Sequence, residues 1–332
     1  MNMEYKFLGN TGVKVSSLCF GTMSFGGIAD ENMSKKMFNA CRDAGVNFFD
    51  CADVYEKGRS EELLGKFIAD CRNEVVITSK VYFKTGEDQN AMGASRYHIV
   101  RAVEASLKRM KTDYIDLYFI HRFDDRTDLE ETLRTLDDLI SHGKILYIGA
   151  SNFAAWQVAK ALGISERNRW SKFVCLQPMY NLVKRQAEVE ILPMALEENL
   201  GVIPYSPLGG GLLSGKYGKS KESGSGRLKD NKMYQIRYKD KWMYEVAHEF
   251  AQLAKEVDVH PVSLAIAWTG AHPGVTAPII GARNMDQLKP ALDSVHVEMN
   301  KKLWKRISAL SYEPVPATDR NEEKSNYNYG LR

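Results

Sequence analysis

The chain has 332 residues, of which 44% are hydrophobic and 26% are charged. This composition is close to the globular average and excludes an intrinsically disordered chain. With 45 Lys and Arg against 42 Asp and Glu, the formal charge is +3, which does not favour a nucleic-acid-binding protein. No run of about 18 apolar residues is present, so no membrane span is expected.

The N-terminus and the cysteines indicate a cytoplasmic protein. The opening segment MNMEYKFLGN is polar and lacks the apolar centre of a signal peptide. The five cysteines form no CxxC pair, which predicts reduced thiols without a disulfide framework or a zinc site. The seven histidines contain no HExxH motif and no paired metal-binding spacing, so we expect no metal.

Short apolar runs alternate with stretches of helical periodicity. A β-hairpin comes first, because Gly9-Asn10-Thr11-Gly12 separates Tyr5–Leu8 from Val13–Ser16. Eight predicted strands follow: Leu18–Phe20, Val46–Phe49, Val75–Thr78, Ile115–Ile120, Ile145–Ile148, Phe173–Leu176, Val202–Tyr205 and Val275–Ile280. The predicted helices are Glu31–Ala44, Ser60–Ala69, Ser95–Met110, Leu129–Ser141, Ala154–Leu162, Glu188–Asn199, Trp242–Val257 and Val262–Trp268. Continuous apolar runs of this kind are typical of strands buried on both faces of a parallel sheet.

This alternation predicts an α/β fold, a single (β/α)₈ barrel domain over residues 1–332 with an N-terminal hairpin. A Rossmann sheet is not favoured, because the first strand–helix turn reads GTMSFGG and lacks GxGxxG. The alternation stops after the seventh strand for about 35 residues, up to Lys241, in a segment rich in Gly, Ser and Lys. The polar tail, residues 313–332, is expected to be loosely ordered or to cross the surface.

Polar side chains follow the predicted strands directly. Asp50, Lys80 and His121 follow the second, third and fourth strands. Ser151, Asn152, Gln177, Ser206, Gly281 and Arg283 follow later ones. Because all strand C-termini of such a barrel open on one face, we expect these residues to surround a single mouth.

Three of these residues, together with Tyr55, suit proton transfer. Taken singly, Asp50 could cap a helix, Lys80 could be solvated, His121 could be a hydrogen-bonded core residue and Tyr55 could serve packing. Together they form a coherent site, since a nearby ammonium lowers the pKa of a phenol from its usual value of about 10. A carboxylate would fix the lysine and an imidazole would orient a carbonyl, so the set predicts protonation of an oxyanion as hydride reaches carbon.

The sequence resembles the aldo-keto reductases from about Phe7 to Ser294, most of the chain. The segments that carry the resemblance are Asn47–Gly65, Val75–Lys80, Asp113–Asp124, Gly143–Asn152, Leu176–Asn181, Ile203–Tyr217 and Pro278–Leu288. The HRFD stretch and the long segment after Tyr205 are most similar to microbial members and to the potassium-channel β-subunit branch.

The resemblance implies an NADP(H)-dependent reduction of aldehyde or ketone carbonyls to alcohols. Tyr55 would donate the proton, and Asp50 and Lys80 would adjust the acidity of its phenol. His121 would orient the carbonyl. The cofactor contacts implied are Gly21, Thr22, Met23, Asp50, Ser151, Asn152, Gln177, Tyr205, Ser206, Pro207, Leu208, Gly210, Lys216, Arg227, Gly281, Arg283 and Gln287. Arg283 favours NADP(H), because guanidinium suits a 2′-phosphate, and NAD(H) is the less favoured cofactor. Many relatives have Glu-Asn where this chain has Pro290 and Ala291. This difference would remove hydrogen bonds to the adenine and weaken cofactor binding, or relax the choice between NADP(H) and NAD(H).

Several alternatives stay open at this point. The chain could be a redox-sensing regulatory subunit of slow turnover, although His121 argues against this, since channel subunits tend to have Asn there. Gly210-x₄-Gly215-Lys216 resembles a P-loop, but Tyr217 replaces the required Ser or Thr, so we interpret it as a loop over phosphates or an unliganded surface loop. The basic segment Lys229–Lys241 is interpreted as a solvated loop face, and His248 and His260 as structural residues.

The expected partner is a small carbonyl substrate, with neither nucleic acid nor membrane. Tyr55, Phe25, Tyr82 and Phe123 predict a partly aromatic substrate pocket. The tail residues Tyr327 and Tyr329 would either close over this pocket or contact a second subunit, so a homo-oligomer stays open.

Overall fold

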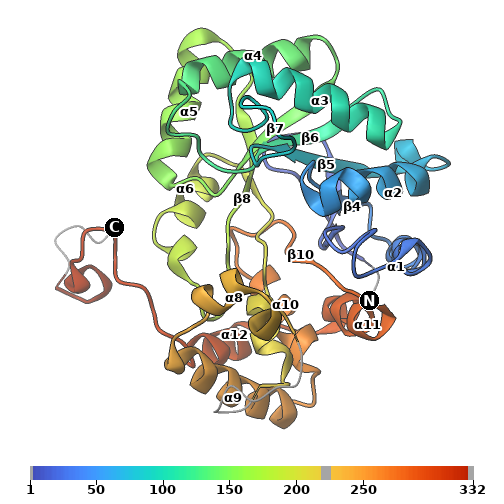
Figure 1. The fold of residues 1–332 in the computed structure, drawn as a ribbon. Coiled ribbons are helices and arrows are strands. Elements are labelled where there is room, and N and C mark those ends of the chain that lie inside the picture. The colour runs from blue at the N-terminus through green and yellow to red at the C-terminus, as the bar shows by residue number, and fades with distance from the viewer. Residues whose placement is uncertain (1–2, 218–225, 328–332) are drawn as a thin grey trace.

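In the computed structural model, which describes residues 3–217 and 226–327, eight parallel strands form one curved sheet (Figure 1). Their spatial order is β10-β3-β4-β5-β6-β7-β8-β9. Their bounds are β3 (Cys19–Gly21), β4 (Phe48–Asp50), β5 (Val76–Val81), β6 (Ile115–Ile120), β7 (Ile145–Ser151), β8 (Phe173–Gln177), β9 (Gly201–Val202) and β10 (Ile279–Ile280).

The seam between the first and last strands of this order is closed by backbone hydrogen bonds. Thr276 N and Ala277 N both donate to Val202 O, at 2.8 and 3.3 Å, and Ile279 N donates to Pro204 O at 2.9 Å. The sheet therefore returns on itself, and the predicted (β/α)₈ barrel is confirmed.

Helices surround the barrel, with α3, α4 and α5 on one side and α9, α10 and α12 on the other in Figure 1. The α-helices are α1 (Glu31–Asp43), α2 (Arg59–Ile68), α3 (Arg96–Met110), α4 (Leu129–Ser141), α5 (Ala155–Asn168), α6 (Ile191–Glu197), α7 (Arg227–Asp230), α8 (Lys232–Arg237), α9 (Lys241–Glu256), α10 (Pro261–Gly270), α11 (Met285–Leu292) and α12 (Lys301–Ser308). The short 3₁₀ segments are η1 (Tyr55–Gly58), η2 (Arg72–Glu74), η3 (Gln186–Glu188), η4 (Gly209–Ser214), η5 (Asp293–His296) and η6 (Asn321–Lys324). Among the described residues, no helix combines the length and the hydropathy needed to cross a bilayer.

The predicted hairpin, β1 (Tyr5–Phe7) and β2 (Lys14–Ser16), closes the N-terminal end of the barrel. Leu8 and Val15 are fully buried in one apolar cluster with barrel residues such as Phe48 and Phe119. The chain approaches the barrel so closely at Gly9, where φ is +55°, that a Cβ atom would lie 2.6 Å from Val174 O. Glycine is the residue that tolerates both conditions. The opposite end of the barrel, where the strand C-termini lie, stays uncovered by the hairpin and is the usual place for a site in this fold.

The long segment after β9, the seventh barrel strand, is more ordered than the sequence predicts. It contains η4, α7 and α8, while residues 218–225 lie outside the described residues. The sequence also gives no sign of α11, which contains Pro290, or of α12. In the tail, Tyr327 is 85% exposed, and the prediction for Tyr329 lies outside the described residues.

Candidate active site

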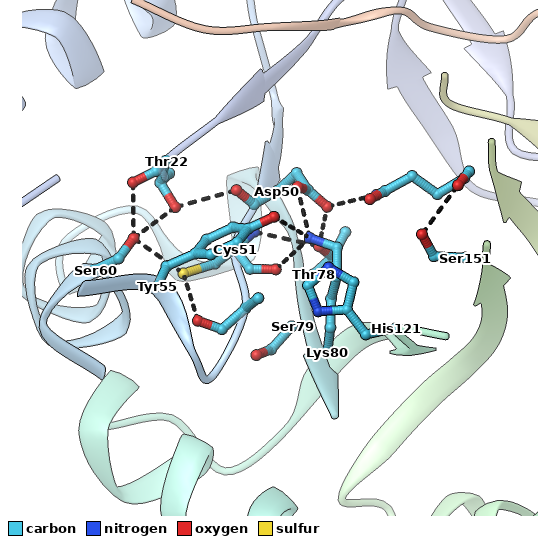
Figure 2. A network of polar contacts seen from close by, with 12 residues as sticks. Thr22, Asp50, Cys51, Tyr55, Ser60, Thr78, Ser79, Lys80, His121 and Ser151 are labelled. Atoms are coloured by element: carbon cyan, nitrogen blue, oxygen red, sulfur yellow. Dashed lines mark hydrogen bonds and ion pairs between the residues drawn. The ribbon is translucent and has the colours of Figure 1, made fainter. Parts of the chain in front are cut away.

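A buried lysine joins three groups at the open end of the barrel. Lys80 Nζ lies 2.7 Å from Asp50 Oδ2, 2.7 Å from Cys51 O and 3.3 Å from the Tyr55 hydroxyl. Figure 2 shows the Tyr55 ring lying beside the Lys80 ammonium, with His121 on the same side. The sequence-predicted Asp, Tyr, Lys and His therefore lie together.

Strand register explains this arrangement. Asp50 ends β4 and pairs in register with Thr78 of β5, and Lys80 is two residues further along β5, so both side chains point to the same face of the sheet. Thr78 Oγ1 and Gln177 Nε2 each donate to Asp50 Oδ1 at 2.8 Å. The Asp50 carboxylate thus accepts bonds from three side chains, which holds the Lys80 ammonium in one place.

The chain beyond Asp50 adopts an unusual conformation that leaves Tyr55 at the mouth. Glu56 and Lys57 have φ angles of +46° and +56°, in the left-handed region. Asn152 and Ser206, which follow β7 and β9, also have positive φ. Non-glycine residues in this region cost of order 1 kcal/mol each and are concentrated at functional sites.

The phenol and the ammonium perturb each other. Burial raises the pKa of Tyr55 to about 12, although the nearby Lys80 ammonium opposes that rise. Burial disfavours the Lys80 ammonium, but the charge and hydrogen bond of Asp50, together with Tyr55 and Cys51, outweigh this effect and the pKa of Lys80 lies above its usual value. At neutral pH the site therefore holds a protonated phenol beside a charged ammonium. The sequence predicts the lowering effect of the lysine correctly but misses the larger effect of burial.

His121 is a neutral imidazole. Burial, and then the Lys80 charge, hold its pKa well below the usual 6.5. Its ring lies edge-on to the Tyr55 ring, with centroids 6.1 Å apart. Its Nδ1 atom is buried and has no hydrogen-bond partner among the described residues. A buried ring nitrogen of this kind is suited to a polar ligand that enters the site.

Amide and hydroxyl groups continue the site around the mouth. Asn152 Nδ2 donates to His121 O at 2.9 Å and to Ser151 Oγ at 3.1 Å, and its Oδ1 accepts from the Tyr205 hydroxyl at 2.8 Å. Ser151 Oγ donates to the backbone oxygen of Gln177 at 3.0 Å. These five residues come from four strand ends and form one connected network.

A cavity of about 940 Å³ extends from this network toward β10 and α11. Sixteen of the seventeen residues that the sequence predicts as cofactor contacts line this cavity. The exception is Thr22, which is fully buried and whose hydroxyl is bonded to Ser60 Oγ and Asp50 O. Lining residues that were not predicted include Ser24, Val54, Phe83, Gly211, Ser214, Met233, Tyr234, Arg237, His260 and Asp286.

The predicted aromatic pocket needs correction. Phe25 is fully buried in the core, and Phe123 packs against Phe153 and Trp156. Neither residue lines the cavity, nor does Tyr82. Phe83 takes this position instead, with its ring edge-on to His121 at 4.8 Å between centroids.

The segment Lys229–Lys241 is not the purely solvated loop that its composition suggests. Its residues Met233, Tyr234 and Arg237 lie on α8 and line the cavity. The guanidinium of Arg237 lies over the Tyr205 and Tyr234 rings, at 6.0 and 5.2 Å. Gly210 passes so close that a Cβ atom there would lie 2.6 Å from Tyr234. His260 caps α10, as its structural interpretation expects, and it also lines the cavity.

Comparison with known proteins identifies the family. The family model "Aldo/keto reductase family" matches residues 17–311. The chain belongs to the aldo/keto reductase family. It is 38% identical to an uncharacterized oxidoreductase of Bacillus subtilis, YrpG, over 93% of this chain and 96% of the relative. It is 37% identical to a probable voltage-gated potassium channel subunit beta of Oryza sativa (89% and 92% covered) and 35% identical to a putative aryl-alcohol dehydrogenase of Schizosaccharomyces pombe (94% and 96% covered).

This aldo/keto reductase has a site that fits the NAD(P)H that its family generally uses. The cavity volume is in the range of cofactor sites. Asn152 and Gln177 bring amide groups to one end, and Lys216 and Arg283 bring cations to the other. Burial and the Arg283 charge both lower the pKa of Lys216, so the two cations lie near each other, as a phosphate site requires. No cluster of three residues suited to a metal occurs in the described part of the chain.

Proposed function

We propose that this protein reduces aldehydes or ketones to alcohols with NADP(H) as the hydride donor. The observation that carries the proposal is the buried contact of Lys80 Nζ with both Asp50 and the Tyr55 hydroxyl, at the inner end of a cofactor-sized cavity. This arrangement holds an acidic proton at one fixed point, where it can reach an oxygen atom of a bound substrate.

Tyr55 is the proposed proton donor. Its raised pKa keeps the phenol protonated at neutral pH, and an alkoxide is basic enough to take that proton. The Lys80 ammonium then stabilises the phenolate that is left, and Asp50 keeps the ammonium in place. The neutral His121 donates a hydrogen bond to the carbonyl oxygen and orients it toward Tyr55 without supplying a competing proton.

The bound cofactor would supply the hydride from its nicotinamide ring. Ser151, Asn152 and Gln177 are proposed to hold its carboxamide, and the Tyr205 ring to stack on the nicotinamide. Ser206, Pro207, Leu208, Gly210, Lys216 and Arg227 would contact the pyrophosphate, and Gly281, Arg283 and Gln287 the adenosine end. Arg283 favours NADP(H) because its guanidinium suits a 2′-phosphate.

A second candidate is a regulatory subunit that binds the cofactor and turns over slowly. The similarity to proteins named as potassium channel β-subunits favours this candidate. The neutral imidazole of His121, set beside the phenol, favours the reductase.

A steady-state assay separates the two candidates. Oxidation of NADPH and of NADH is followed with a panel of small aldehydes and ketones, for the wild type and for Tyr55→Phe. The proposal expects oxidation of NADPH that depends on Tyr55 and exceeds that of NADH. Tight NADPH binding without turnover of any carbonyl would support the regulatory candidate instead.

A further inference from the structure

Most arginines of this chain pair with carboxylates, but those of the cavity do not. Of the seventeen arginines at described positions, eleven form ion pairs. Four of the remaining six line the cavity: Arg122, Arg227, Arg237 and Arg283. Arginine stays charged at any physiological pH, so the cavity carries positive charge that is available to anionic ligands.

Two of these cations, Arg227 of α7 and Arg283 after β10, are proposed contacts of the cofactor phosphates. Arg237 of α8 lies over the Tyr205 and Tyr234 rings, which engage its guanidinium. Arg122 follows β6, which is four strands from β10 in the ring of eight, on the opposite side of the barrel. The cofactor phosphates and the two tyrosine rings therefore account for three cavity arginines and leave Arg122 for another ligand.

Arg122 directly follows His121, at the end where reduction would occur. It is exposed and has no ion pair among the described residues. The neighbouring Asp124 already accepts bonds from Ala94 N, Arg126 N and Thr127 Oγ1, at 2.8, 3.1 and 2.7 Å. The carboxylate closest to Arg122 in the sequence is thus occupied elsewhere.

Other groups near Arg122 are apolar, neutral or already engaged. Val54 and Phe83 line the cavity, and His121 is uncharged. The Lys80 ammonium is fully buried and is paired with Asp50, and the Arg237 guanidinium lies over the Tyr205 and Tyr234 rings. Arg122 is therefore a charged group that stays available to an entering substrate beyond the apolar surface.

We propose that the physiological substrate is a carbonyl compound that carries an anionic group, a carboxylate or a phosphate, on an apolar body, and that Arg122 binds this group. The inference rests on the proposed function, because it names the substrate class of the same site. A guanidinium binds a carboxylate or phosphate through two parallel hydrogen bonds, so it would fix the carbonyl relative to Tyr55 and His121.

The test compares charged and neutral forms of one substrate. The three isomers of carboxybenzaldehyde are assayed beside their methyl esters, which have the same ring and carbonyl without the charge. We expect kcat/KM for at least one acid to exceed that for its ester by about tenfold or more. Arg122→Ala should bring this ratio to about one by lowering kcat/KM for the acid.

Arg126→Ala is the matched control, because Arg126 is an exposed, unpaired arginine of the same loop that does not line the cavity. It should leave the ratio unchanged. Acid-to-ester ratios near one in the wild type, or a high ratio that persists in Arg122→Ala, would overturn the inference.

A binding measurement separates failure of the inference from failure of the proposed function. Titration calorimetry of the carboxybenzyl alcohols, with and without NADP⁺, requires no turnover. Binding that weakens about tenfold in Arg122→Ala but not in Arg126→Ala supports the anion site even if no carbonyl is reduced. Binding that is equal in the wild type and Arg122→Ala overturns it, even if the esters are reduced in a Tyr55-dependent manner.

Discussion

The two ends of the cavity carry their charges in opposite ways. At the inner end, Asp50 and Lys80 are buried on neighbouring strands and form an ion pair of 2.7 Å. At the outer end, Arg227 and Arg283 come from a short helix and a loop, and they have no carboxylate partner among the described residues. A paired buried charge is held in place and positions its neighbours, whereas an unpaired charge is available to a ligand. The two ends of the cavity therefore have two separate roles.

Lys80→Met should have the largest effect, because it breaks the inner pair. We expect kcat to fall at least about 100-fold and the free energy of unfolding to fall by about 3–5 kcal/mol, since Asp50 is left buried without its cation. Urea denaturation and steady-state kinetics measure both quantities. The double variant Asp50→Asn/Lys80→Met removes both charges, so it should regain stability but not activity. If Lys80→Met is as stable as the wild type, Asp50 is not held by an energetically important pair.

Arg283→Ala tests the outer end. Loss of a guanidinium from a 2′-phosphate should raise KM for NADPH by about tenfold or more and change KM for NADH by less than about twofold. Arg169→Ala, an exposed and unpaired arginine away from the cavity, serves as the control. Equal changes for both cofactors would remove Arg283 from the proposed phosphate contact.

Asp53→Asn provides a contrast with Asp50, three residues earlier. Asp53 is equally buried but forms no ion pair with any residue that the structure describes, and burial, followed by the Glu61 charge, raises its pKa to about 8. Between about pH 4 and pH 8 the native state keeps a proton that the unfolded state has lost, so stability falls as pH rises through this range. Asp53→Asn should therefore stabilise the protein by about 2–4 kcal/mol at pH 7 and by little at pH 4. Thermal unfolding at both pH values measures this, and an equal effect at pH 4 and pH 7 would contradict it.

His121 should contribute no pH dependence at all. Its pKa is held well below 6.5, so the imidazole stays neutral across the physiological range. We expect kcat/KM for carbonyl reduction to show no inflection between about pH 6 and pH 8. An inflection near pH 6.5 that disappears in His121→Gln would show that the imidazole titrates, contrary to its buried position.

The inner end was predictable from sequence because its residues follow continuous apolar strands. Once a barrel is inferred, strand ends meet at one mouth, and Asp50, Lys80 and His121 are placed without knowledge of side-chain contacts. The burial of Tyr55 was not predictable, since it depends on how η1 folds over the mouth. The rise in the pKa of Tyr55 was missed for this reason.

The outer end was predictable only in part. Arg283 follows a strand and was identified, but Tyr234 and Arg237 lie in a basic, glycine- and serine-flanked segment with weak helical periodicity. Composition there indicates a solvated loop, and the tertiary contact of α8 with the cavity leaves no periodic signal in so short a helix. In the loop after the third predicted strand, Tyr82 was chosen over Phe83, because the two neighbouring aromatics are equally good candidates from sequence.

The most direct test of the proposed proton donor separates cofactor binding from chemistry in Tyr55→Phe. The dissociation constant for NADPH is measured by fluorescence, and a single turnover of the preloaded protein is followed with an aldehyde that the wild type reduces. The account predicts a dissociation constant within about twofold of the wild type and a hydride-transfer rate lower by about 100-fold or more. A rate close to that of the wild type, with binding unchanged, would contradict the assignment of Tyr55 as the proton donor.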